Sequence, residues 1–80
     1  MKSLLILGAG GFGQMIQETA RLIGYAKVVF LDDAAKGEDV IGKCCDYQAF
    51  LGEYDTAVAA LGDNGMRLYW TEKLMEAGYK

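Results

Sequence analysis

The six residues from Gly8 to Gly13 carry the clearest chemical pattern in the chain. They read Gly-Ala-Gly-Gly-Phe-Gly and match G-x-G-x-x-G, which is informative when it follows a strand and opens a helix. In that context Gly8 permits a tight turn, Gly10 lets a ligand approach the backbone, and Gly13 lets the helix pack closely on the strand. The free N–H groups of the first helical turn then favour an anion. We predict a diphosphate-binding loop; the alternative is a glycine-rich turn used only for packing.

An acidic pair, Asp32 and Asp33, ends the next apolar run. Asp32 lies about 20 residues after Gly13, where a dinucleotide-binding fold places an acid that accepts hydrogen bonds from ribose hydroxyls. Asp33 doubles the negative charge, which would repel a 2′-phosphate and so disfavours NADP. The alternative is that these acids form the strand-to-loop turn, an interpretation that suits Asp33 better than Asp32.

A second glycine-flanked junction, Gly62-Asp63-Asn64-Gly65, follows a later apolar run. If the strands lie in the order three, two, one, four, this junction neighbours the glycine loop, and ligands of open parallel sheets bind in the crevice between two such junctions. There Gly62 would let a ligand lie close and Asn64 would offer an amide. The alternative for Asn64 is a plain helix N-cap. We expect Arg67 to pair with Asp63 within the helix.

Apolar runs and helical spacing predict the elements that position these residues. An unbroken apolar run such as Ser3 to Leu7 is typical of a strand buried on both faces of a parallel sheet. The expected elements are a strand at 3–7, a helix at 12–23 ended by a left-handed Gly24, a strand at 28–31, a weak strand at 40–44, a short helix at 47–51, a strand at 55–61 and a helix opened by Asp63 or Asn64. The fold class is therefore α/β, a small parallel sheet of about four strands with flanking helices.

The spacing of apolar residues also predicts which face each helix buries. The expected stripes are Phe12, Met15, Ile16, Thr19, Ala20 and Ile23 on the first long helix, and Met66, Trp70, Leu74 and Ala77 on the last.

Composition excludes several classes of function. The net charge of -3 argues against a broad cationic surface for nucleic acid or anionic lipid. The longest apolar stretch is far below the ~20 residues of a membrane span, so we expect a cytoplasmic protein with Cys44 and Cys45 reduced. The absence of histidine removes the commonest general base and metal ligand. We therefore expect no catalytic residue and no metal site within these residues.

The end of the chain repeats an earlier pattern. Ala77-Gly78-Tyr79-Lys80 resembles Ile23-Gly24-Tyr25-Ala26-Lys27, which leads from a helix into a strand. We therefore interpret residues 1–80 as one domain at the front of a longer protein.

Four segments in this order resemble a known family. They are the glycine loop, Phe30-Leu31-Asp32-Asp33, Leu61-Gly62-Asp63-Asn64 and Glu76-Ala77-Gly78-Tyr79-Lys80. Together they make essentially the whole chain similar to the N-terminal domain of bacterial sugar O- or N-acyltransferases of the PglD/NeuD type. The resemblance implies a small Rossmann-like unit that holds a UDP-aminosugar or related sugar nucleotide. It further implies a following left-handed β-helix that forms a homotrimer, binds acetyl-CoA and supplies a catalytic histidine.

The resemblance also assigns site residues. It implies that Gly10, Gly11 and Phe12 contact the phosphates or sugar, that Asp32 and Asp33 contact the uridine, and that Gly62 contacts the substrate beside the loop. Many members have Gly-Gly-His-Gly where this chain has Phe12. A contact from that histidine's imidazole is therefore lost here, whereas the backbone N–H is retained.

Three functions are consistent with these observations. The first is a sugar-nucleotide-binding domain of an acetyl-CoA-dependent acetyltransferase, in which these residues bind and orient while the reaction happens elsewhere in the parent chain. The second is an NAD-binding regulatory or dehydrogenase module, because the glycine loop and Asp32 suit an adenosine ribose equally well. The third is a domain that only packs on a partner.

Overall fold

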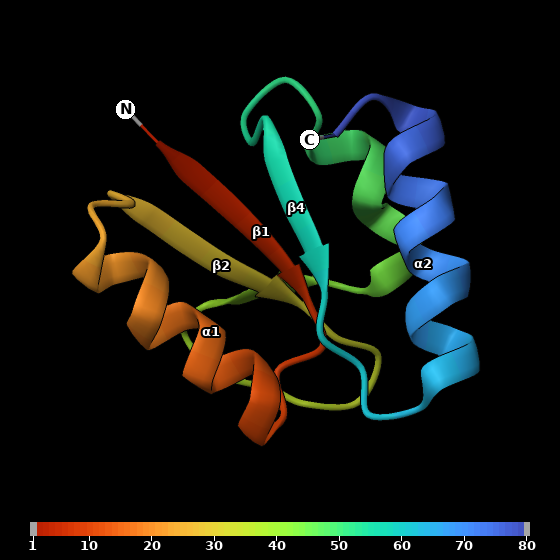
Figure 1. Ribbon diagram of the computed structural model, residues 1–80, viewed down its shortest axis with the longest axis horizontal. Helices are drawn as coiled ribbons and strands as arrows, with labels where there is room; N and C mark the ends of the chain where they lie inside the picture. The colour runs from red at the N-terminus through yellow and green to blue at the C-terminus, as the bar shows by residue number, and fades with distance from the viewer. Residues whose placement is uncertain (1, 80) are drawn as a thin grey trace.

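A four-stranded parallel sheet forms the centre of the molecule, as seen in a computed structural model that describes residues 2–79 (Figure 1). Its strands are β1 (Ser3–Leu7), β2 (Lys27–Leu31), β3 (Val40–Gly42) and β4 (Thr56–Ala59), in the order β3-β2-β1-β4. This is the order in which the two glycine-flanked junctions become neighbours. Because β1 pairs in parallel with both β2 and β4, the ends of these three strands meet at one edge of the sheet.

Helices cover both faces of this sheet (Figure 1). The α1 helix (Gly11–Leu22) lies on one face, and the 3-10 helix η1 (Cys44–Phe50) and α2 (Asn64–Ala77) lie on the other. Successive residues of β1 point to opposite faces, so Leu4 and Ile6 enter the cluster beneath α1 while Leu5 and Leu7 enter the cluster beneath α2. The unbroken apolar run of β1 is explained by burial on both sides.

Both long helices end in the same backbone turn. Gly24 has a φ of +103° and follows α1, and the Tyr25 N–H donates to the Ala20 carbonyl at 3.0 Å. Gly78, with a φ of +109°, ends α2 in the same way, and the Tyr79 N–H donates to the Leu74 carbonyl at 3.1 Å. The left-handed cap predicted at Gly24 is confirmed. Lys80, the last residue of the repeated pattern, lies outside the described residues.

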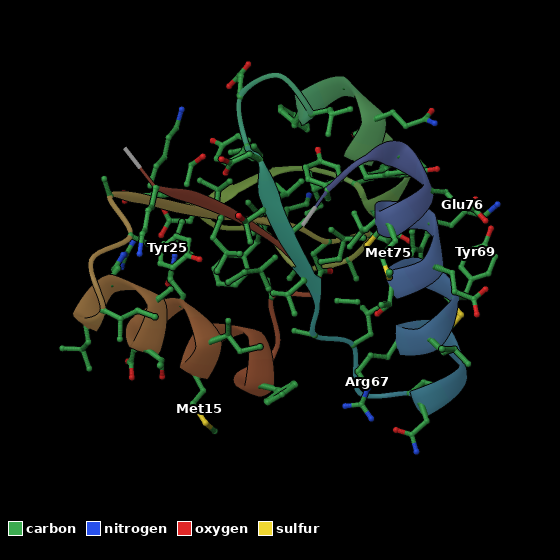
Figure 2. All side chains as sticks on the ribbon, turned by 45° about the horizontal axis from the view of Figure 1, so that its top comes forward. Met15, Tyr25, Arg67, Tyr69, Met75 and Glu76 are labelled. Atoms are coloured by element: carbon green, nitrogen blue, oxygen red, sulfur yellow. The ribbon has the colours of Figure 1, made fainter. Side chains whose placement is uncertain are left out.

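The predicted apolar stripe of α1 is only partly buried. Ala20 is buried and Ile16 packs half-buried against the same cluster, as predicted, whereas Met15 and Ile23 are 60% and 65% exposed. Gly13 and Gln17, which lie outside the stripe, are buried in their place. Figure 2 shows Met15 directed away from the sheet. The polar Gln17 is accommodated because its Nε2 donates to the Val28 carbonyl at 3.1 Å and to Asp39 Oδ2 at 2.9 Å.

The predicted stripe of α2 is correct only in its second half. Leu74 is buried and Trp70 is half-buried, with its ring edge-on to Tyr47 of η1 at a centroid distance of 5.7 Å. Met66 is 48% exposed, because the first turn of α2 extends past the end of β4 (Figure 1).

The segment between β2 and β4 follows the predicted order with shifted boundaries. The expected weak strand ends at Gly42, and η1 begins at Cys44, before the expected helix at 47–51. Side-chain hydrogen bonds cause the shift, since Asp33 Oδ1 accepts from the Cys44 N–H at 3.0 Å and Asp46 Oδ2 accepts from the Lys43 N–H at 2.9 Å. These contacts start a helical turn where apolar spacing alone indicates strand.

Gly13→Ala is expected to destabilise the fold. A Cβ at this position would lie 2.0 Å from the Gly8 carbonyl oxygen, so α1 would have to move away from the end of β1. We expect a loss of about 1–3 kcal/mol in the free energy of unfolding, measured by urea denaturation. The control is Gly52→Ala, where a Cβ meets nothing within 4 Å. Equal stability of the two variants would contradict this account of the helix packing.

Candidate functional site

The glycine loop joins β1 to α1 through two positions that only glycine fills without strain. Gly8 has a φ of +106°, and a Cβ there would lie 3.0 Å from Leu61 Cδ2 and 3.1 Å from the Ala60 carbonyl oxygen. Gly13 is held against Gly8 as described above. Gly10 and Gly11 are exposed, and a Cβ at either would meet nothing within 4 Å. The packing glycines thus occupy the base of the loop, and the open ones face solvent.

The first turn of α1 presents backbone donors at this open side. Gly10 is the N-cap residue of α1. As a glycine it has no side chain that could accept a hydrogen bond from the first turn. The Gln14 N–H donates to the Gly10 carbonyl at 2.9 Å, so the preceding N–H groups of Gly11, Phe12 and Gly13 lack an acceptor within the helix. The helix dipole adds positive potential there. The side chain of Phe12 is 48% exposed and does not fill the loop. The arrangement suits an anion.

Asp32 reaches this loop from the end of β2, but it contacts the backbone. Its Oδ2 accepts from the Ala9 N–H at 2.7 Å, and its Oδ1 accepts from the N–H groups of Ala34 at 2.8 Å and Ala35 at 2.7 Å. These bonds take three of the roughly four acceptor positions of a carboxylate. The bonds from Ala9 and Ala35 are the main reason that the pKa of Asp32 lies below its usual value. The predicted contact with ribose remains a prediction.

Asp33 lies on the surface beside it and helps to begin η1. Its Oδ1 accepts from the Cys44 N–H at 3.0 Å, in agreement with the turn-forming interpretation. The Cys44 thiol is buried, and burial followed by the charges of Asp33 and Asp32 raises its pKa to about 11. This thiol is therefore protonated near neutral pH and a poor nucleophile.

The β4–α2 junction lies next to the glycine loop, as predicted. The Ala60 N–H donates to the Leu7 carbonyl at 2.7 Å, which brings the end of β4 against the start of the loop. Gly62 is exposed, and a Cβ at this position would meet nothing within 4 Å. The two glycine-flanked junctions are therefore neighbours at one edge of the sheet.

Asp63, rather than Asn64, is the N-cap of α2. Its side chain accepts from the Met66 N–H at 2.8 Å. Asn64 is the first helical residue, and its Oδ1 accepts from the Arg67 guanidinium. The expected side-chain pair between Arg67 and Asp63 is therefore wrong, because Asp63 is turned toward the helix backbone. Figure 2 shows Arg67 extending from the first part of α2 to the side that faces α1, beside the segment that joins β4 to this helix.

Two open cavities lie on the β2 side of the molecule. One, of about 420 Å³, extends from Ala9 of the glycine loop along Gln14, Gln17 and Arg21 of α1 to the loop that follows β2. The other, of about 350 Å³, lies over Asp32, Asp33 and residues 34–37 and 40–43. Both are lined by Lys36. Sequence reasoning missed Gln14 and Lys36, although the position of Gln14 directly after the glycine motif is a usable signal.

Residues 2–79 contain neither a cluster of metal-ligating side chains nor a helix that could span a membrane. No group of three or more His, Cys, Asp or Glu side chains there is arranged to hold a metal ion. None of the helices in this part of the chain is both long and apolar enough to cross a membrane.

Comparison with known proteins identifies related folds. Residues 3–74 match the family model described as the PglD N-terminal domain. The acetyltransferase domain of PglB from Neisseria gonorrhoeae FA1090, solved with acetyl coenzyme A, superposes with a TM-score of 0.87 at 33% identity, covering 99% of this chain and 41% of that one.

Two more distant structures share the fold. A variant of perosamine N-acetyltransferase from Caulobacter crescentus, solved with CoA and GDP-perosamine, has a TM-score of 0.86 at 20% identity, covering 99% of this chain and 40% of that one. RSP, a Rex-family repressor, has a TM-score of 0.72 at 20% identity, covering 100% of this chain and 43% of that one. The chain thus spans less than half the length of the proteins it matches.

The stability of the fold is expected to depend on the charge of Asp32. Its pKa is lowered in the folded state, so its contribution is present above the pKa of the unfolded chain and is lost as the pH falls through the folded value. We expect Asp32→Asn to lower the free energy of unfolding by about 1–3 kcal/mol near neutral pH, because at least one backbone N–H loses its acceptor. The difference between the two proteins should shrink in acid. Urea denaturation across this range measures it, and a difference that is independent of pH would contradict the assignment.

Proposed function

The chain belongs to the PglD N-terminal domain family, and on that premise we propose that it is the sugar-nucleotide-binding domain of an acetyl-CoA-dependent sugar acetyltransferase. The observation that carries the proposal is that the backbone N–H groups of Gly11, Phe12 and Gly13 have no acceptor within residues 2–79. They come directly after a strand buried on both faces. A helix N-terminus in this position suits a diphosphate. The net charge of -3 makes a local backbone site more suitable than a broad cationic surface.

The layout of the site suggests how such a ligand lies. The diphosphate occupies the open side of the glycine loop, beside Gly10 and Gly11. The nucleoside extends toward the end of β2, where Asp33 is exposed and can accept from a uracil or ribose donor. The sugar extends toward Gly62, whose lack of a side chain leaves space beside the loop. Asn64 holds Arg67, which favours a supporting role for its amide over direct contact.

The acetyl transfer itself is assigned to the rest of the parent chain. The 33% identical PglB domain was solved with acetyl coenzyme A, and this chain covers 41% of it. The chain of 80 residues contains no histidine, so the general base that an acetyl transfer requires is best placed outside it. We propose that this domain binds and orients the acceptor sugar, that a β-helix domain holds acetyl-CoA, and that the parent is a cytoplasmic homotrimer.

An NAD-binding module is the second candidate. The likeness to the Rex-family repressor is at 20% identity and concerns the fold alone. The acid that would hold an adenosine ribose, Asp32, already accepts from three backbone N–H groups. The engagement of Asp32 favours the sugar nucleotide over NAD.

Calorimetric titration separates the candidates. We expect UDP or GDP to bind more tightly than NAD under matched conditions. All three carry a diphosphate, but Asp32, which would hold the adenosine ribose of NAD, already accepts from three backbone N–H groups. Preference for NAD would reject the assignment. If none of these nucleotides stabilises the protein, the partner-packing interpretation is favoured, since a ligand at 100 times its dissociation constant should add about 2.7 kcal/mol.

Gly11→Pro tests the backbone donors directly. Proline at the first helical position keeps the helix and removes only one N–H, and a Cβ at Gly11 meets nothing within 4 Å. We expect the affinity for UDP or GDP to fall about tenfold, the effect of losing one hydrogen bond to a charged group. Gly11→Ala retains the N–H and should lose much less. If the two variants bind equally well, the N–H of Gly11 does not hold the phosphate.

A further inference from the structure

The two peptide groups that flank Ala9 are each held by a side chain from another element. The Ala9 N–H donates to Asp32 Oδ2 at 2.7 Å, and the Ala9 carbonyl accepts from Gln14 Nε2 at 3.1 Å. Ala9 is flanked by Gly8 and Gly10, which are the residue type with the greatest conformational freedom. The two hydrogen bonds therefore restrain the middle of a segment that would otherwise have many accessible shapes.

The same carboxylate also holds the start of the loop after β2. Asp32 Oδ1 accepts from the N–H groups of Ala34 and Ala35 at 2.8 and 2.7 Å. Asp32 thus joins the two segments that border the open cavities described above, the glycine loop and residues 34–39. These three bonds leave about one acceptor position of the carboxylate open. A ligand that drew the carboxylate away would leave a backbone N–H without its acceptor, which is costly in a partly buried place.

We propose that Asp32 is a positioning residue for the diphosphate site, acting through the Ala9 N–H to hold the glycine loop in its binding shape without touching the nucleotide. This inference rests on the proposed function of the site. The position of Asp32 after β2 predicts a direct contact with ribose hydroxyls. In the role proposed here, Asp32 instead supports the loop that binds phosphate, and other groups contact the ribose.

The bond itself is tested in the wild-type protein by NMR. A scalar coupling across the hydrogen bond between the Ala9 amide nitrogen and the Asp32 carboxyl carbon is expected in the free protein and should persist when UDP or GDP saturates the site. Loss of this coupling on binding would overturn the proposal, because it would mean that the carboxylate leaves the loop for the ligand. This measurement does not depend on whether a variant folds.

A thermodynamic cycle tests the role in binding. Asp32→Asn is expected to weaken UDP or GDP by about tenfold, and to weaken the 2′,3′-dideoxy form of the same nucleotide by the same factor. Two changes that do not share a contact have additive effects. If Asp32→Asn weakens the ribonucleotide at least fivefold more than the dideoxynucleotide, a direct ribose contact replaces the proposal.

Asp46→Asn is the matched control. Asp46 also accepts a backbone N–H, from Lys43 at 2.9 Å, but it lies at the start of η1 and does not contact the glycine loop. We expect it to leave nucleotide affinity within about twofold of the wild type. An equal loss in both variants would show a general effect of removing a carboxylate and would overturn the proposal. Failure of the wild type to bind UDP and GDP would instead reject the proposed function, while the coupling in the free protein would still report on the loop.

Discussion

The close approach of α1 to the end of β1 is the constraint on which the rest of the structure depends. The space for a Cβ at Gly13 is taken by the Gly8 carbonyl oxygen, so the helix can start only where both positions are glycine. This contact directs the first turn of α1 along the end of the strand and leaves its N–H groups unpaired at the open edge of the sheet. The contact between Gly13 and Gly8 thus places the exposed N–H donors of α1 directly at the end of the buried strand.

Hydrogen bonds from side chains to the backbone turn this packing into a defined loop. Asp32 and Gln14 hold the Ala9 peptide from opposite sides, and Asp33 begins η1 through the Cys44 N–H. Both acids therefore accept hydrogen bonds from the backbone. Because the net charge of the protein is -3, an anion at the glycine loop would depend on the local N–H donors and the dipole of α1.

The two faces of the sheet are covered to different extents. On one face, η1 and α2 enclose a cluster that contains Tyr54 and Tyr79, and the Tyr79 hydroxyl donates to the Tyr47 carbonyl at 2.5 Å. On the other face, α1 stands alone, and an apolar groove of about 390 Å³ remains between Leu4 of β1, Val58 of β4 and the exposed side of the helix. The apolar residues that helical spacing assigns to the core, such as Met15 and Ile23, border this groove.

The sequence by itself determined the parallel strands, the left-handed cap at Gly24 and the glycine loop between strand and helix. Each of these follows from local patterns: an apolar run, a change of period, or a glycine where the backbone requires it. Tertiary structure decided which face of α1 is buried and what Asp32 contacts. The first depends on how closely Gly13 lets the helix approach the sheet, and the second depends on Ala9, which is distant in sequence and adjacent only after β1 and β2 pair. Spacing along a chain reports the period of an element, whereas the partner of a side chain is set by which elements pack together.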